Sequence, residues 1–271
     1  LQLRFYAGGV QGDESEVIRK IRSGRLDGAA VTAVGLSQIH RPALVFQIPG
    51  ILQNYDQLDK ARAALGPELD KGFSEAGFKM LGWADVGQTR IFSRSPVKTP
   101  ADLANKRPWL WRDDLVLPSF YGSTKTTPVP LQVPEVLGAL QTNRIDTLIV
   151  SPVSAVSLQW SSRVTHMTAF PINITVGGTV LSDKTFKSLS AEHQKILLET
   201  ADQFHALARR NLRNDEKQAL ATLAQRNISV VNLSKAEEDQ WRALSAKARA
   251  KLAGKIADAK LVDQVAKFGQ E

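Results

Sequence analysis

Residues 128–152 read "PVPLQVPEVLGALQTNRIDTLIVSP", a short helical pattern followed by an apolar run. The pattern predicts a helix from Pro134 to Thr142, and the apolar run predicts a strand that ends at Ser151 and Pro152. A helix that leads directly into a buried strand is the repeating unit of α/β folds. The stretch therefore indicates an α/β fold if the flanking sequence repeats the unit.

The flanking sequence repeats this alternation on both sides. Residues 1–6, 26–35 and 78–87 predict strands, and residues 12–24 and 56–76 predict helices. Strands that alternate with helices of about ten residues are typical of parallel α/β sheets. We therefore expect parallel sheets in this chain.

Local signals mark where the helical regions begin and end. Asp13 precedes a first turn rich in acidic residues, and Gly24 follows the last turn, as expected for an N-cap and a helix end. We interpret Asp13 and Glu14 as carboxylates that complement the helix dipole rather than as a catalytic pair. From Ser190 onward the pattern is mostly helical, interrupted by "ISVVNLS" at residues 228–234.

The composition is that of an ordinary globular chain of 271 residues, 43% hydrophobic and 23% charged. No apolar run approaches the roughly 18 residues that span a bilayer, and the opening "LQLRFYAGG" is not a signal peptide. The absence of cysteine excludes disulfides, thiol catalysis and Cys-ligated zinc. The net charge of +8 would suit an anionic partner. However, the basic residues are scattered and alternate with acidic ones, which argues against nucleic-acid binding.

Residues that could carry catalysis are sparse. The four histidines, His40, His166, His193 and His205, show no metal-ligand spacing such as HExxH or HxH. The chain has no GxSxG, Walker or GxGxxG motif, and the glycine-rich "YAGGVQGDE" lacks the lysine of a phosphate-binding loop. The sequence therefore predicts no enzyme, no metal site and no cofactor.

Tryptophans offer a better indication of ligand recognition. In "KRPWLWRDD", residues 106–114, Trp109 and Trp111 are two positions apart, so in an extended segment both indoles point to the same side. Trp83 and Trp160 also fall at or near predicted element ends, where α/β ligand crevices form. Large aromatic residues also fill cores. Either a ligand wall or a core cluster is consistent with the pattern.

Five segments, taken in order, resemble the substrate-binding proteins of TRAP transporters, the DctP family. They are "GGVQGDESEVIRKIRSGRLDGAAVT", "ALVFQIPGILQNYDQLDKA", "VKTPADLANKR", "PVPLQVPEVLGALQTNRID" and "LSDKTFKSLSAEHQKIL". Each match is loose, but the ordered set runs through nearly the whole chain. The sequence is therefore identified as a member of this family.

The resemblance implies an exported, periplasmic protein with two α/β lobes joined by crossing strands and a long helix. A small organic acid would be held between the lobes and delivered to a cation-coupled membrane permease, with hinge closure around the ligand. We expect residues 1–88 and 176–214 to form lobe I, and residues 89–175 and 215–271 to form lobe II. We expect no nucleic-acid partner, and the protein itself would not span the membrane.

One departure from the family lies at the start of the chain. Family members open with a further strand and helix before the strand that matches "LQLRFY", and this sequence has neither. We expect the sequence to be truncated, or incompletely ordered, at this end.

A second departure concerns the residues that hold the ligand. In the family register Trp109 stands where an arginine usually clamps a carboxylate, and Ser151 stands where an asparagine is usual. An indole offers one N–H donor and a flat apolar face in place of a bidentate cation. Arg90, in "GQTRIF", matches a second family arginine and would supply the remaining charge.

These departures predict a ligand site that is more aromatic than usual. Its ligand would be a hydrophobic or aromatic monocarboxylate, or a neutral amphiphile, with Trp109 as the main contact. An alternative is a sensor or scaffold protein of the same fold, and an enzyme is a more distant one. The predicted site comprises walls, hydrogen-bonding groups and a cation: Trp109, Trp111, Trp83, Trp160 and Phe170; Thr32, Gln132 and Ser151; and Arg90.

Overall fold

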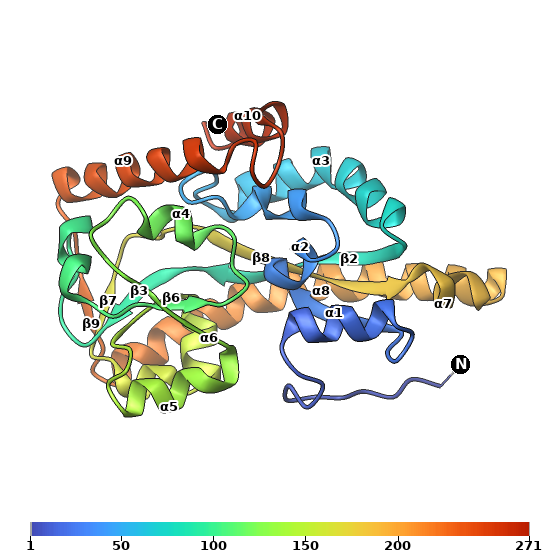
Figure 1. The fold of residues 1–271 in the computed structure, drawn as a ribbon, viewed down its shortest axis with the longest axis horizontal. Helices are drawn as coiled ribbons and strands as arrows, with labels where there is room; N and C mark the ends of the chain where they lie inside the picture. Colours follow the sequence, from blue (N-terminus) through green and yellow to red (C-terminus); the bar gives the residue numbers. More distant parts are fainter. Residues whose placement is uncertain (1, 271) are drawn as a thin grey trace.

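The computed structural model describes residues 2–270 and contains two lobes, each built around its own sheet (Figure 1). The first sheet has the order β1 (Gly28–Thr32), β8 (Ile174–Ser182), β2 (Phe78–Gln88). The second has the order β6 (Thr147–Val150), β3 (Arg90–Ser93), β7 (His166–Thr168), β9 (Ser229–Val231). A separate pair joins β4 (Trp109–Trp111) to β5 (Val129–Leu131).

Helices cover both sheets. Those before β3 are α1 (Glu14–Arg22), α2 (Ala33–Ser37), the 3₁₀ helix η1 (Arg41–Gln47) and α3 (Tyr55–Glu75). Between β3 and β8 lie η2 (Pro100–Asn105), α4 (Leu117–Tyr121), η3 (Val133–Glu135), α5 (Val136–Gln141), α6 (Pro152–Ser157) and η4 (Trp160–Arg163). After β8 come α7 (Asp183–Ser188), α8 (Ala191–Gln225), α9 (Lys235–Leu252) and α10 (Ala259–Phe268).

The opening stretch folds as predicted, because η3 and α5 occupy the predicted helix and β6 ends immediately before Ser151. The prediction for α1 is also confirmed, since the Asp13 side chain accepts a hydrogen bond from the Glu14 backbone N–H at 2.7 Å. The helix predicted over 56–76 is α3, and the mostly helical C-terminal third includes the 35-residue α8. These elements could be predicted because apolar spacing and capping residues act between residues that are close in the sequence.

The expectation of parallel sheets was wrong. Among the described strands, β8 is antiparallel to both β1 and β2, and β3 is antiparallel to both β6 and β7. Only the β4–β5 and β7–β9 ladders are parallel. The reason lies in the chain path: β2 leads out of the first lobe and β8 returns to it, so the two neighbouring strands run in opposite directions.

The strand predicted over residues 1–6 is also wrong where the structure describes it. Residues 2–6 form no strand, and Leu3 and Phe5 are exposed; Leu1 lies outside the described residues. No described strand pairs with this segment, so its backbone has no ladder of hydrogen bonds to hold it in a sheet. The strand predicted over 26–35 ends early, at Thr32, because its side chain accepts from the Val34 N–H and starts α2.

Two short segments and one long helix connect the lobes (Figure 1). Thr89 alone separates β2 from β3, and its N–H donates to the Asn173 carbonyl at 2.8 Å. The Thr89 carbonyl in turn accepts from the Ile172 N–H at 2.9 Å. The two crossing segments are therefore tied to each other at a single point, while α8 runs behind both lobes.

The core divides into clusters that follow the lobes. The first-lobe cluster includes Phe46, Phe73 and Trp83, and the second lobe has one cluster on each face of its sheet. The exact lobe boundaries stay a prediction. The helix α10 packs its buried face into the first-lobe cluster (Figure 1), although residues 215–271 were expected in the second lobe.

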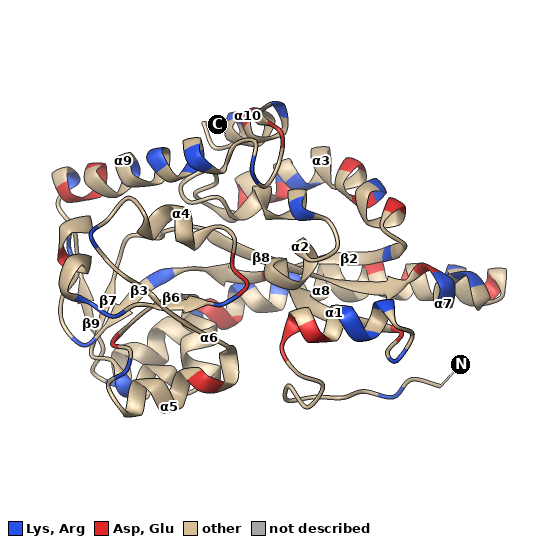
Figure 2. Ribbon diagram, in the orientation of Figure 1, with Lys and Arg blue, Asp and Glu red and all other residues tan. Residues whose placement is uncertain are grey.

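Charged residues of both signs are interspersed along the surface helices, as Figure 2 shows for α3, α7 and α9. Most of the ion pairs along these helices join residues four apart, such as Lys187 with Asp183 and Arg242 with Glu238. Such pairs make small contributions to helix stability. In the part of the chain that the structure describes, no helix is both long enough and apolar enough to cross a bilayer.

Candidate functional site

Arg90 lies at the edge of the second sheet, directly after the crossing. It pairs with Val150 across the β3–β6 ladder, so Arg90 and the following Ser151 lie at the same edge. The Arg90 Nε is buried without a hydrogen-bond partner, and no described residue forms an ion pair with its guanidinium. Burial lowers the pKa of Arg90, and Glu216 opposes this change. This cation is therefore half-buried and not directly neutralised.

Glu216 explains why Arg90 has no direct partner. This buried carboxylate of α8 accepts hydrogen bonds from the Gln88 N–H at 3.0 Å and from the Tyr55 hydroxyl at 2.5 Å. Both oxygens are thus occupied by groups of the crossing and of α3. Glu216 influences Arg90 through its charge, while the hydrogen-bonding groups of Arg90 remain available.

Three of the predicted tryptophans come together in the second lobe. The Trp109 ring stacks on Trp111 with centroids 6.1 Å apart and meets the edge of Trp160 at 5.2 Å. The Trp109 indole N–H donates to the Leu131 carbonyl at 3.0 Å, and the side chain lies in the core cluster. Trp109, the expected main contact, is thus a buried support behind the more exposed Trp111.

Trp111 makes a contact between the lobes. Its indole N–H donates to Asp13 Oδ2 at 3.0 Å, while the other Asp13 oxygen caps α1 in the first lobe. Val116, which follows β4, is also buried in the first-lobe cluster. The segment from Trp111 to Val116 therefore joins the second lobe to the first.

Thr32, a predicted ligand contact, is hydrogen-bonded to Glu14. Its carboxylate accepts from the Thr32 N–H at 2.8 Å, from the Thr32 hydroxyl at 2.9 Å and from the Gly35 N–H at 2.7 Å. Burial is the main cause that raises the pKa of Glu14 to about 7, against the lowering effect of these donors. The Thr32 hydroxyl, predicted to bind ligand, already donates to Glu14.

The remaining predicted polar groups act as helix caps. Ser151 is buried, accepts from the Ser154 N–H at 3.2 Å and donates to the Ser154 hydroxyl at 2.9 Å. The Gln132 N–H donates to Glu135 Oε2 at 2.8 Å at the start of η3. Both residues lie at ends of second-lobe elements, and their contact with a ligand stays a prediction.

Trp83 lies apart from the other predicted residues. Its ring packs edge-on against Phe46 and Phe73, and its indole N–H donates to Asp70 at 3.0 Å. These partners belong to the first lobe, on the side of β2 that faces α3. Trp83 therefore packs within the first lobe, and its contact with a ligand stays a prediction.

A network of charges lies near Trp83, in a hollow of about 720 Å³ between α3, β2 and α8. Asp85 is fully buried and pairs with Arg62 at 2.7 Å and with Arg213 at 2.9 Å. Arg213 also pairs with Asp59 at 2.7 Å. Each of these arginines is paired with a carboxylate, although Arg62 Nη1 is buried without a hydrogen-bond partner, and this pairing indicates a structural role.

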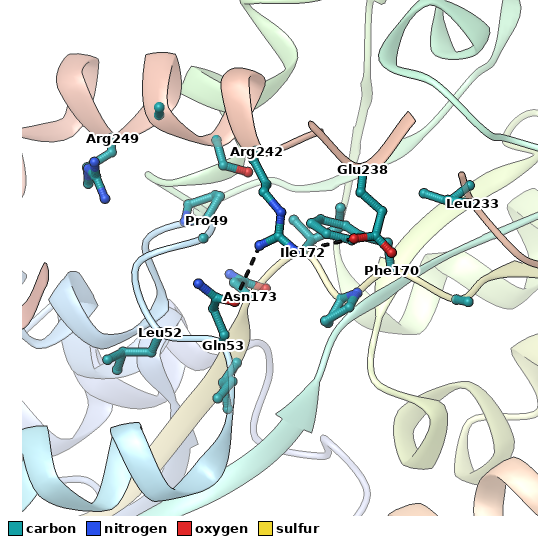
Figure 3. Close-up of a pocket in the computed structure, with 16 residues that line it drawn as sticks. Pro49, Leu52, Gln53, Phe170, Ile172, Asn173, Leu233, Glu238, Arg242 and Arg249 are labelled. Carbon is teal, nitrogen blue, oxygen red and sulfur yellow. Dashed lines mark hydrogen bonds and ion pairs between the residues drawn. The ribbon is translucent and has the colours of Figure 1, made fainter. Parts of the chain in front are cut away.

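A second hollow, of about 410 Å³, lies where α9 faces the crossing (Figure 3). Arg242 spans it, donating to Gln53 Oε1 at 3.3 Å and to Glu238 Oε2 at 3.2 Å. The Arg242 guanidinium also lies over the Phe170 ring, 5.2 Å from its centroid. Phe170 is the only predicted site residue that lines this hollow.

Sequence reasoning missed Asp13, Glu14 and Glu216 as members of this arrangement. Asp13 and Glu14 were recognised only as first-turn carboxylates, and nothing in the local pattern singles out Glu216 along α8. Their partners are far away in the chain, such as Trp111, 98 residues from Asp13. Among the described residues, no group of three or more His, Cys, Asp or Glu side chains could hold a metal ion.

Comparisons with known proteins agree with the fold. Residues 1–255 match the family model of bacterial extracellular solute-binding protein family 7, DctP. The 2,3-diketo-L-gulonate-binding periplasmic protein YiaO of Escherichia coli (strain K12) is 24% identical over 251 residues, which cover 85% of this chain. The chain spans 71% of that protein's length, and 62% and 60% of the lengths of two further relatives.

Solved structures show the same two-lobed architecture. A TRAP periplasmic solute-binding protein from Shewanella oneidensis with bound succinate has a TM-score of 0.89 at 20% identity, covering 95% of this chain and 85% of that one. DctP7 of Bordetella pertussis, an extracytoplasmic solute receptor binding pyroglutamic acid, has a TM-score of 0.90 at 19% identity. That match covers 99% of this chain and 88% of the other.

Proposed function

Because the chain belongs to family 7 of the bacterial extracellular solute-binding proteins, we propose that it captures a small organic acid between its lobes in the periplasm. It would then deliver the acid to the membrane permease of a TRAP transporter. The family and the fold are those of solute-binding proteins of transport systems rather than of enzymes. The periplasmic relatives support the proposed compartment.

Arg90 is the observation that carries the proposal. A half-buried guanidinium with a buried, unpaired Nε and no ion-pair partner carries a cost that a compensating charge would remove. A carboxylate can compensate it with short, charge-assisted hydrogen bonds, and a guanidinium is shaped to receive one. Arg90 also lies where the chain passes from one lobe to the other, so a bound acid would contact both lobes.

Arg90 is the one cation among the predicted site residues, and this favours a ligand with one carboxylate. In the family register Trp109 stands where an arginine usually clamps the carboxylate, and its N–H is already bonded to Leu131. The Trp111 N–H is likewise bonded, to Asp13, so Trp111 offers a ligand its ring rather than a donor, with Trp109 buried behind it. We therefore propose a monocarboxylate with an apolar or flat body, of the size of pyroglutamate or a small aromatic acid.

The contact between Trp111 and Asp13 supports closure of the lobes around this ligand. It joins a second-lobe strand to the first helix of the first lobe and would break if the lobes moved apart. A hinge at the crossing, where Thr89 and Asn173 bond to each other, would permit such a motion. The Trp111 side chain would then act both as a wall and as part of the closure.

A thermal-shift panel tests the function and the ligand class together. Bound ligand stabilises the folded protein by mass action, by about 2.7 kcal/mol at a hundred times its Kd. The panel compares pyroglutamate, benzoate and cyclohexanecarboxylate with succinate and D-glucuronate. Stabilisation by the first group supports the proposal. Tight binding of succinate with no response to any apolar or cyclic monocarboxylate would overturn the ligand class.

A further inference from the structure

The hollow behind the crossing is built from three distant parts of the chain. One wall is the segment of residues 49–53, another is the crossing segment of residues 169–174, and the third is α9 (Figure 3). Its volume of about 410 Å³ is in the range of small-molecule sites. Arg90, Trp109 and Trp111 do not line it. The hollow is therefore separate from the site proposed for the transported acid.

One end of the hollow carries unused donors. Arg249 and Ser245 lie one turn apart on α9, and both line the hollow. No described residue accepts a hydrogen bond from the Arg249 guanidinium or forms an ion pair with it. Arg242, one turn further from Ser245 in the other direction, is already bonded to Glu238 and Gln53. Arg249 is therefore the cation that remains for a ligand.

The facing surface is apolar. Pro49 and Leu52 lie on the segment of residues 49–53 in Figure 3, and Ile172 lines the hollow from the crossing segment. The two segments are joined by a hydrogen bond from the Gly50 N–H to the Ile172 carbonyl at 3.0 Å. An occupant near Arg249 would thus meet donors on α9 and mainly carbon surface on the other two walls, to which Gln53 and Asn173 add polar groups.

We propose that this hollow is a second binding site, which takes a small organic anion with one carboxylate and an apolar body. The carboxylate would bind the Arg249 guanidinium and the Ser245 hydroxyl, and the body would cover Pro49, Leu52 and Ile172. A neutral compound of the same shape would lose the charge-assisted hydrogen bonds and bind more weakly. The site does not depend on which acid Arg90 holds.

Isothermal titration calorimetry with phenylacetate as the probe tests the site, with phenylacetamide as the neutral compound of the same shape. Each is titrated into the full chain, into Arg249→Gln and into Arg90→Met. Because phenylacetate also belongs to the ligand class proposed for Arg90, wild type should show two binding events, and Arg90→Met should keep only the event at the hollow. In Arg249→Gln the event at the hollow should be about 10- to 100-fold weaker, because charged hydrogen bonds are lost. Phenylacetamide should be weaker by a similar factor.

A blocking variant provides an independent arm. Ala246 lines the hollow from an exposed position of α9, so Ala246→Phe fills the space without changing any charge. Introduced into Arg90→Met, it should abolish the remaining phenylacetate binding, while thermal unfolding stays close to that of Arg90→Met. The second site is overturned if Arg90→Met does not bind phenylacetate at millimolar concentration, or if adding Arg249→Gln or Ala246→Phe to it leaves that binding unchanged. Binding lost in Arg90→Met alone would also overturn it, while supporting the proposed function.

Discussion

Arg213 and Arg90 are two partly buried arginines with opposite surroundings. Hydrogen bonds that Arg213 donates to the Asp59 carboxylate, and also to Asp85, raise the pKa of Arg213, whose charge is thus neutralised within the protein. Burial lowers the pKa of Arg90, and Glu216, whose charge opposes this change, is bonded elsewhere. The same residue type therefore serves structure in one place and remains available to a ligand in the other.

The difference follows from what a buried charge requires. A buried ion pair with good geometry satisfies both partners, and removing one partner leaves an uncompensated charge. A buried cation without a partner reduces stability until an anion binds, so its cost in the free protein becomes affinity for the ligand. The four predictions below test this distinction, beginning with the largest expected effect.

Replacing Asp85 with alanine should reduce the free energy of unfolding most. The change leaves Arg62 and Arg213 facing a buried space without their shared carboxylate, which typically costs about 3–5 kcal/mol. Urea unfolding followed by circular dichroism measures the loss. Asp59→Ala is the matched control, because Asp59 is 44% exposed and its loss should cost about 1 kcal/mol or less. Equal losses in the two variants would contradict the structural assignment.

Glu14 should make stability fall as the pH rises. Its pKa is raised from 4.5 in the unfolded chain to about 7 in the folded protein, so the folded protein binds more protons in between. The stabilisation is complete below pH 4.5 and is lost as pH rises through 7, by at most about 3 kcal/mol.

Glu14→Gln should remove this pH dependence. Urea unfolding at pH 5 and pH 8, compared between wild type and the variant, isolates the contribution of Glu14. A wild-type protein that gains stability relative to the variant at pH 8 would show that the three donors outweigh burial. The Glu14 carboxylate would then be charged in the folded state at neutral pH.

Replacing Arg90 with methionine should weaken binding of the acid that stabilises the protein most in the thermal-shift panel. The expected loss is about 10- to 100-fold, because the charge-assisted hydrogen bonds are removed. The ligand-free variant should be as stable as wild type or more so, because a buried cation without an ion-pair partner is removed. Calorimetry and urea unfolding measure the two effects. A variant that loses stability as Asp85→Ala does, yet binds normally, would make Arg90 structural and refute the comparison.

Replacing Trp111 with phenylalanine should have the smallest effect. The ring remains, but the N–H bond to Asp13 is lost, so ligand should bind about 5-fold more weakly, near the 1 kcal/mol of a typical hydrogen bond. Asp13→Ser keeps an N-cap oxygen for α1 but removes the acceptor for Trp111. The double variant should be no weaker than either single one. Additive losses would show that the two residues act separately.

Much of the fold could be predicted from local sequence. The helices α1 and α3 were predicted nearly to their ends, because Asp13 and the apolar spacing act within one turn. The pairing of strands could not be predicted, because it depends on β8 returning from the other lobe. The strand expected at residues 2–6 failed for the same reason, since a strand requires a neighbour that its own residues do not specify.

The candidate site divides in the same way. The sequence indicated that Trp109 departs from the family pattern, that Arg90 matches it and that Trp109 and Trp111 point to one side, and these two tryptophans do stack on each other. It could not show that Trp109 is buried behind Trp111, because both residues follow the same alternation along the strand. That difference arises from Trp160 and Leu131, which the fold brings against Trp109.

The sequence by itself determined the family, the helices with their caps and the residue types available near the crossing, because each depends on short-range patterns. The tertiary structure decided which of these groups found partners. Asp85 lies between two arginines, Asp13 accepts from Trp111, and Glu216 bonds to Tyr55 and Gln88, which leaves Arg90 without a direct partner. Charge compensation depends on distances between side chains far apart in the chain, and only the folded path sets those distances.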